Sequence, residues 1–314
     1  MSSRKKALLY ILLANALWGV APSFIKLGLQ TMPPLTFLFL RFLISTTVIL
    51  PFFIIELKKH PIKLAQVPTP FFIGIVCYTI SLSLVFLGIQ KTTALDSSLI
   101  GSIEPIVVCL LGAVFLGEAL SKNRLAGITI SLLGTLLIIL EPFFSLMVGQ
   151  GPVADGASQR ILGNLLIALY LISNGIYVIT TRKYFKKRSS VTPFIKVGIG
   201  FVAATITLFP LAMFELASLP FSLISTQSTI FTLSTLIPLL YMALFSGIAA
   251  YLLCEKALKV LEASDTVLFT YLQPLFAVPV SYLLLGEKPT VVFALGAVVI
   301  VVGVFIAERK YKNF

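Results

Sequence analysis

The sequence predicts an all-α polytopic membrane protein with ten transmembrane helices, arranged as two inverted-topology five-helix repeats. Three observations support this fold class. Only 11% of the 314 residues are charged and 58% are hydrophobic, whereas about a quarter of the residues of soluble domains are charged. The apolar residues fall into stretches of about 20 residues, the length that spans a bilayer. Finally, the segment 94–134 recurs at 263–303 without a gap.

The repeat rests on residue types that are uncommon in an apolar chain. Sliding the chain against itself places Pro105 on Pro274 and Gly117 on Gly286. Chance matches in such a chain would mostly pair Leu with Leu, so the match indicates an internal duplication. The expected divisions are 1–145 for the first five-helix repeat, 146–159 for an outer linker and 160–314 for the second, inverted repeat.

The ten predicted helices follow one another with short polar or proline-containing breaks. One further segment, 218–234, is ambiguous because Ser and Thr interrupt its apolar residues, and it either lies along the membrane interface or forms a loop. The helices are expected near 7–26, 35–55, 70–90, 98–116, 122–140, 160–181, 191–214, 235–254, 265–285 and 290–307.

The basic residues predict the orientation. A net charge of +12 would favour nucleic acid as the partner of a soluble chain, but no basic and aromatic motif of a nucleic-acid module is present. The excess instead fits the enrichment of Lys and Arg in cytoplasmic loops. With the N-terminus inside, the outer side holds only Lys26, Lys91, Arg160 and Lys288. We therefore expect a plasma or inner membrane protein with both termini in the cytoplasm.

This orientation has a consequence for the two halves. Because each half has an odd number of helices, the second half must enter the membrane upside down. Inverted repeats recur in secondary transporters, whose substrate site lies near mid-membrane where the repeats meet.

Glu104 and Pro105 are the sharpest chemical feature of the sequence. Pro105 lacks an N–H and its ring clashes with the carbonyl of Gly101, so the helix should bend there. Glu104 and Arg41 are both predicted inside the membrane, where a charge costs about 3 kcal/mol. Two interpretations remain open: the two side chains form a fixed ion pair, or they contact substrate or a coupling proton.

Helical spacing places polar residues on single faces of several predicted helices. Ser97 and Gly101 share a face with Glu104, and their repeat positions Thr266 and Thr270 share one with Gln273. Alternatively, Ser and Thr bond to their own helices, and Trp and Tyr mark the membrane interface. The candidate substrate-binding residues are Asn15, Trp18, Arg41, Tyr78, Ser81, Gly101, Glu104, Asn174, Tyr177, Thr270 and Gln273, with Glu104 as the candidate coupling residue.

Glycines are predicted to shape turns and contacts. Gly117 and Gly286 are each expected to end a helix in the left-handed conformation, and the glutamate after each to lie at the N-terminus of the next helix. Gly134 and Gly303 belong to glycine faces that let the fifth and tenth helices approach neighbours closely, within the chain or in a homodimer.

The sequence indicates no metal and no cofactor. Cys77, Cys109 and Cys254 lie in apolar runs without metal-ligand spacing and are expected to be small core residues. No P-loop is present, which argues against direct ATP drive.

The paired blocks and the first helix together resemble a known family. Each block has a small-residue and acidic start, a proline inside the helix and a Gly-Glu turn, while the first helix carries Asn15-Ala16-Leu17-Trp18-Gly19. Arg41 also lies where that family often has an arginine. The chain is similar to EamA-type members of the drug/metabolite transporter superfamily. The resemblance implies the fold and transport, and leaves the substrate open. The second half of the chain departs from the first at Gln273, where the first half has Glu104.

These features predict a secondary active transporter, an exporter or a permease, for small metabolites such as amino acids or related amphipathic compounds. Its partners are expected to be that substrate and the lipid bilayer. Glu104 is the candidate proton carrier if transport is proton-coupled. The alternatives are a nucleotide-sugar or phosphate exchanger of the same superfamily, an intramembrane enzyme and a passive channel. No helix carries paired acids or a catalytic histidine, so the sequence predicts no enzyme.

Overall fold

The computed structural model describes residues 3–116, 122–147, 154–187, 191–218, 233–261 and 268–308, and helices are the only regular secondary structure in these ranges. Six segments are single helices. They are α1 (Ser3–Gly28), α2 (Pro34–Lys59), α7 (Lys122–Met147), α8 (Ala154–Lys187), α9 (Pro193–Ala217) and α15 (Val291–Glu308).

The remaining segments change their helical winding partway. After the short 3₁₀ turn η1 (Leu64–Gln66), α3 (Pro68–Gly74), η2 (Ile75–Ser81) and α4 (Leu82–Lys91) follow without a break. α11 (Leu233–Leu240), η4 (Tyr241–Ala249) and α12 (Ala250–Val260) do the same in the second half. Both η2 and η4 are π-helical. The two other composite segments are α5 (Ala94–Gly101) with α6 (Glu104–Leu116), and the 3₁₀ turn η5 (Leu268–Leu272) with α14 (Gln273–Leu285).

Seven of the described helical stretches are long and apolar enough to cross a membrane. Three shorter apolar helices accompany them, at Leu125–Glu141, Phe269–Leu285 and Val291–Gly303. The protein is therefore an all-helical, multi-pass membrane protein. The ten crossings and the inverted repeat remain predictions, and most of the segment 218–234 lies outside the described residues.

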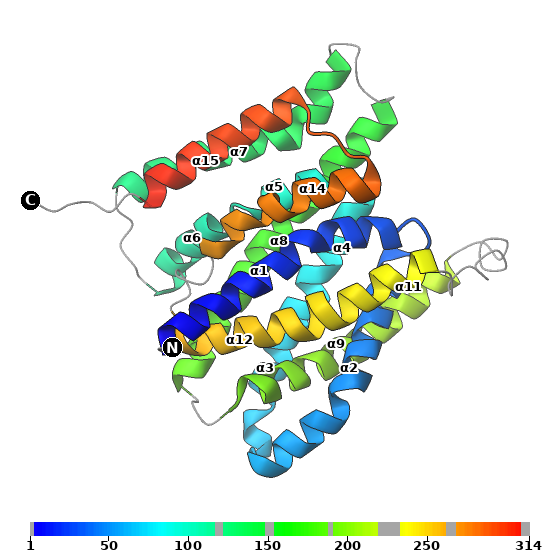
Figure 1. Ribbon diagram of the computed structural model, residues 1–314, viewed down its shortest axis with the longest axis vertical. Helices are drawn as coiled ribbons and strands as arrows, with labels where there is room; N and C mark the ends of the chain where they lie inside the picture. The colour runs from blue at the N-terminus through cyan, green and yellow to red at the C-terminus, as the bar shows by residue number, and fades with distance from the viewer. Residues whose placement is uncertain are drawn as a thin grey trace, which may run out of the picture.

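Helices of the two sequence halves pack on each other throughout the bundle. α15 lies alongside α7, α2 packs on α9, and α4 packs on α8 (Figure 1). α1 lies between α14 and α12 (Figure 1). The apolar core is thus shared between the halves.

Glycine makes the contact between α7 and α15 possible. A Cβ atom at Gly134 would lie 3.0 Å from the carbonyl oxygen of Gly296, and one at Gly303 would lie 2.6 Å from the backbone nitrogen of Ser131. The glycine faces predicted from the sequence therefore let these two helices touch within one chain. In this structure the surface considered for a homodimer is covered by the chain itself.

The bend predicted at Pro105 is confirmed, and the winding also changes at the repeat-related Pro274. α5 ends at Gly101 and α6 begins with Glu104 and Pro105, and η5 gives way to α14 at Gln273 and Pro274. Because proline cannot donate to the preceding turn, the winding must change at these points. A Cβ atom at Gly101 would meet nothing within 4 Å, so the backbone borders open space there.

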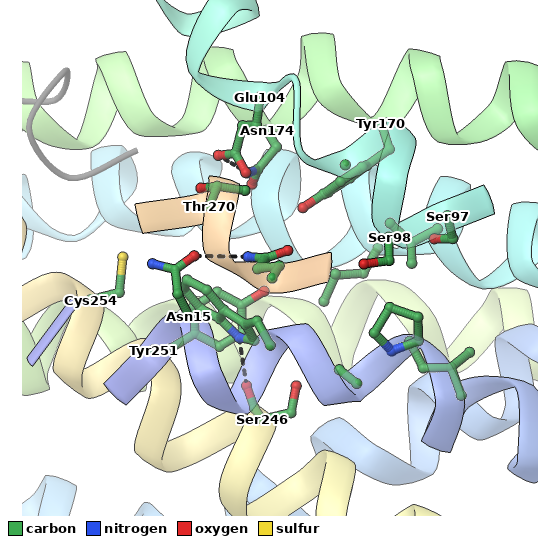
Figure 2. Close-up of a pocket in the computed structure, with 18 of the residues that line it drawn as sticks. Asn15, Ser97, Ser98, Glu104, Tyr170, Asn174, Ser246, Tyr251, Cys254 and Thr270 are labelled. Carbon is green, nitrogen blue, oxygen red and sulfur yellow. Dashed lines mark hydrogen bonds between the residues drawn. The ribbon is translucent and has the colours of Figure 1, made fainter. Parts of the chain in front are cut away.

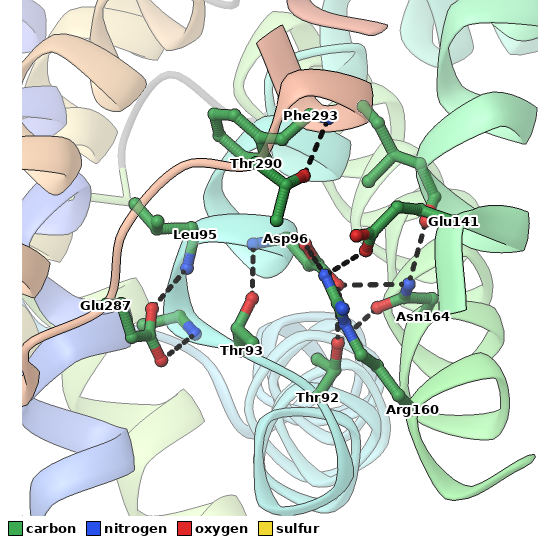
Figure 3. A network of polar contacts seen from close by, with 12 residues as sticks. Thr92, Thr93, Leu95, Asp96, Glu141, Arg160, Asn164, Glu287, Thr290 and Phe293 are labelled. Carbon is green, nitrogen blue, oxygen red and sulfur yellow. Dashed lines mark hydrogen bonds and ion pairs between the residues drawn. The ribbon is translucent and has the colours of Figure 1, made fainter. Parts of the chain in front are cut away.

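Gly286 adopts the predicted left-handed conformation, with φ 67°, at the end of α14. The prediction for the following residue was wrong. Glu287 accepts hydrogen bonds from the backbone N–H groups of Ala94 and Leu95, each at 3.0 Å (Figure 3). It therefore caps the first turn of α5 in the other half instead of the helix that follows it. Gly117 and Glu118 lie outside the described residues.

Candidate functional site

A cavity lies between the two halves, with walls formed by helices of both. It offers about 110 Å³ to the centres of water-sized molecules, where a single water needs roughly 10–15 Å³. A small metabolite therefore fits. Nine of the predicted binding residues line this cavity: Asn15, Trp18, Arg41, Gly101, Glu104, Asn174, Tyr177, Thr270 and Gln273. Thr266 lies outside the described residues.

Two amide contacts join the helix breaks to the opposite half (Figure 2). Asn174 Nδ2 donates to Glu104 Oε1 at 2.7 Å. Gln273 Nε2 donates to Asn15 Oδ1 at 2.8 Å. Each contact links the residue before a repeat-related proline to the first helix of the other repeat. The arrangement is matched between the halves, except that Glu104 is ionisable and Gln273 is not.

The π-helical turns supply acceptors to side chains of neighbouring helices. A π-turn shifts the backbone hydrogen bonds and is common at functional sites. Trp18 Nε1 donates to the carbonyl oxygen of Ser246 in η4 at 3.0 Å, and Ser45 donates to that of Ala243 at 2.8 Å. The Trp18 ring also packs edge-on against Tyr251, with centroids 5.1 Å apart. These contacts fix the indole on the cavity wall.

Two predicted site residues do not line the cavity. The Tyr78 ring packs behind the wall against Tyr251 and Phe201, with centroids 4.7 and 5.2 Å away. Ser81 donates to the carbonyl oxygen of Val76 and to the Ser173 hydroxyl. Helical spacing placed both residues on one polar face, but the π-turn that contains them changes that spacing.

Arg41 lies on the cavity wall, and its side chain is almost fully buried, with an exposed fraction of 1%. The predicted alternative of an ion pair with Glu104 is wrong, because the carboxylate of Glu104 is bonded to Asn174. Arg41 instead lies with its guanidinium carbon 5.1 Å from the centre of the Phe42 ring.

Sequence reasoning missed a buried ion pair beside the cavity. Lys196 Nζ and the Tyr177 hydroxyl both donate to Glu255 Oε1, each at 2.6 Å. Lys196 is 2% exposed and Glu255 is fully buried. Glu255 stands in an apolar helix, which is the signal that could have identified it. Tyr177, which lines the cavity, connects the pair to the site.

A second polar network lies at the N-terminal end of α5 (Figure 3). Arg160 contacts both oxygens of Asp96, through Nε at 2.8 Å and Nη2 at 3.0 Å, and also pairs with Glu141. Asn164 adds a hydrogen bond to Asp96 at 3.2 Å. Arg160, which was expected on the outer side of the membrane, is a partly buried member of this cluster.

No group of three or more His, Cys, Asp or Glu side chains that could hold a metal ion occurs among the residues that the structure describes. Cys77 and Cys254 are buried and Cys109 is half-buried.

Comparison with known proteins adds to these observations. The model of the EamA-like transporter family matches residues 5–140 and 161–308. The chain is similar to an uncharacterized transporter of Archaeoglobus fulgidus, with 24% identity over 97% of this chain and 98% of the relative. It is also similar to the probable amino-acid metabolite efflux pump of Escherichia coli, with 27% identity over 97% and 95%.

One solved structure, titled only "Crystal structure of protein", shares the fold with a TM-score of 0.63 at 19% identity, covering 97% of each chain. At this identity the likeness concerns the fold alone.

Proposed function

Because the chain belongs to the EamA-like transporter family, we propose that it is a secondary transporter of small metabolites, such as amino acids or related amphipathic compounds. In this proposal the substrate occupies the central cavity, which opens alternately to each side of the membrane. The Escherichia coli relative is named a probable amino-acid metabolite efflux pump, which supports this substrate class.

The cavity is the observation that carries the proposal. Its wall combines aromatic residues such as Trp18 and Tyr177 with the polar groups of Asn15, Asn174 and Gln273. Such a lining suits a small molecule with an apolar part and a polar part. The nine predicted residues that line it are the proposed substrate-binding residues.

The paired structural features support the proposal that the halves are inverted repeats. Both halves break their helix before a repeat-related proline, and both carry a π-turn. The contacts Glu104–Asn174 and Gln273–Asn15 join corresponding helices in exchanged order. Binding between inverted repeats is typical of secondary transporters. The excess of basic residues in alternate loops supports cytoplasmic termini and a plasma or inner membrane location.

Glu104 is the proposed proton carrier. It is 8% exposed, it lines the cavity, and an amide is its only bonded partner in the described part of the chain. A carboxyl in that position can exchange a proton with the cavity without breaking an ion pair. Gln273, at the repeat-related position, has no proton to exchange.

The phosphate or nucleotide-sugar exchanger is the weaker alternative. Such substrates need cationic groups for their phosphates. Lys196, one candidate, is already neutralised by Glu255, which leaves Arg41 on the wall. The family and the names of the relatives indicate a transporter and not an enzyme.

Counterflow in liposomes tests the proposal. Liposomes that contain the purified protein would be loaded with one unlabelled member of a panel of amino acids, nucleobases and cationic drugs. The entry of the same compound, labelled and added outside, would then be measured. We expect saturable counterflow for at least one amphipathic metabolite. Absence of counterflow for the whole panel, alongside an active control carrier, contradicts the transporter proposal, and non-saturable flux indicates a channel.

Glu104→Gln tests the coupling proposal in the same liposomes. We expect the variant to lose the dependence of net transport on pH. Counterflow needs no net proton movement, so it should fall only as far as the lost contact between Glu104 and the substrate weakens binding. The matched double variant adds Gln273→Glu and should not restore that dependence, because Asn15 Nδ2 is engaged with the carbonyl of Ile11 and its Oδ1 would face the new carboxylate. Unchanged pH dependence in Glu104→Gln contradicts the coupling role only.

A further inference from the structure

Arg41 differs from Lys196, Arg160 and Lys26 in what surrounds it. Lys196 has Glu255, and Arg160 has Asp96 and Glu141. Lys26 donates to the carbonyl oxygens of Ile89 and Thr92 at the end of α4. In the described part of the chain Arg41 has no acidic partner, although it is 1% exposed, and its buried Nε has no hydrogen-bond partner.

The groups around Arg41 compensate its charge only in part. The Phe42 ring offers a cation–π contact at 5.1 Å, and the Tyr251 hydroxyl lies beside the guanidinium. The Tyr78 ring packs against both Phe42 and Tyr251. None of these side chains is an acid, and one ring contact offsets only a fraction of the free energy needed to bury a cation. The site is therefore incomplete without an anion.

The cavity is where an anion can reach Arg41, because Arg41 and Tyr251 both line it. Tyr251 lies across the cavity from Glu104 (Figure 2). A guanidinium is a planar fork that binds a carboxylate through two parallel hydrogen bonds. Glu104 lines the same cavity and accepts one hydrogen bond, from Asn174, so its carboxylate has room to accept another from a cationic group of the same molecule.

We infer that Arg41 binds a carboxylate group of the transported molecule, so that the substrates are monocarboxylates and, where an amine reaches Glu104, zwitterionic amino compounds. This inference rests on the proposed function, because it assumes that the cavity is the substrate site. One guanidinium balances one negative charge, which favours a carboxylate over a doubly charged phosphate.

Matched compounds test the inference. Counterflow would be measured with leucine and phenylalanine, with their methyl esters, which lack the carboxylate, and with their α-keto acids, which lack the amine. For the wild type we expect the acids to be exchanged and the esters to be roughly 10-fold poorer or worse, as for loss of a charge-assisted hydrogen bond. Arg41→Gln should lose that preference, while Arg41→Lys should keep part of it.

A binding measurement keeps the test independent of transport. Phenylacetate at millimolar concentration should raise the melting temperature of the wild type, and neutral phenylacetamide should not. In Arg41→Gln neither compound should raise it. Inorganic phosphate is the third probe, and stabilisation by phosphate alone would overturn the inference in favour of a phosphate substrate.

Stability separates a binding role from a structural one. Arg41→Gln removes an uncompensated buried charge and should not lower the melting temperature. The matched control Arg160→Gln removes a paired charge and should lower it. A large loss of stability in Arg41→Gln, or equal exchange of acids and esters by the wild type, overturns the inference. If no compound in any set is exchanged, the proposed function fails as well.

Discussion

Lys196 and Glu255 place two opposite charges beside the cavity, almost completely out of contact with solvent. The free energy of burying each charge is offset by the other and by the Tyr177 hydroxyl. Replacing a buried pair with neutral groups is often harmless, but removing one partner leaves an uncompensated charge. The pair therefore behaves as a unit.

We expect Lys196→Met to destabilise the protein by about 3–5 kcal/mol, because Glu255 then stays buried without its cation. The double variant Lys196→Met/Glu255→Gln should recover most of that loss. Tyr177→Phe removes one hydrogen bond and should have the smallest effect. Thermal unfolding in detergent measures the stability of all three variants. If the double variant lost as much stability as the two single substitutions added together, Lys196 and Glu255 would not act as a unit.

At the scale of single helices, glycine and proline decide how closely segments approach and where they bend. α7 and α15 touch because Gly134, Gly296 and Gly303 carry no side chain at the contact. Between helices in a membrane there is little hydrophobic drive, so such close packing contributes directly to association.

Gly303→Ala should destabilise the protein by about 1–3 kcal/mol, as overpacking does in other tight contacts. A Cβ atom there would lie 2.3 Å from the Ser131 hydroxyl oxygen and 2.6 Å from the Ser131 nitrogen. Val301→Ala, on the exposed side of the same helix with 64% exposure, is the control and should be nearly neutral. The melting temperatures of the two variants are compared. Equal melting temperatures would show that α7 and α15 do not need their close contact.

The sequence predicted those features that a residue carries by itself. Pro105 bends its helix because a proline lacks an N–H, and Gly286 ends its helix because glycine tolerates a positive φ. The π-turns at Ile75–Ser81 and Tyr241–Ala249 have no such local signal. Tyr78 and Ser81 were misplaced for this reason.

Contacts between residues that are far apart in the chain could not be predicted from the sequence either. Helical periodicity shows which residues share a face, but not which helix that face meets. Glu287 was expected at its own next helix and instead caps α5. An ion pair between Arg41 and Glu104 was one of two open interpretations, and Glu104 bonds to Asn174. Nine of the predicted residues still reach the cavity, because polar faces in a membrane bundle turn inward.

The whole molecule is held together mainly across its two halves. α15 packs on α7, α2 on α9 and α1 on α12 and α14. Ser23 and Ser281 add a buried hydrogen bond of 2.7 Å between their hydroxyls. Neither half can bury its inward faces without the other.

Two separately encoded halves, divided between the end of α7 at Met147 and the start of α8 at Ala154, should therefore assemble when produced together. We expect them to purify as a complex and to show counterflow, because the contacts between the halves do not depend on a continuous backbone. Each half produced alone should be degraded or aggregate. Stable insertion and purification of the first half by itself would contradict the dependence of each half on the other.

The unfilled space beside Gly101 is a suitable site for a chemical label that reports which side of the membrane the cavity is open to. A cysteine there would present its sulfur to the cavity. Because Cys254 lines the same cavity and Cys109 is half-buried, the native cysteines would first be replaced with serine or alanine. Thiol reagents that do not cross the lipid, added from one compartment at a time, would label that sulfur only when the cavity is open to their side. The labelling rate from each compartment then measures how much of the time the cavity is open to that side of the membrane.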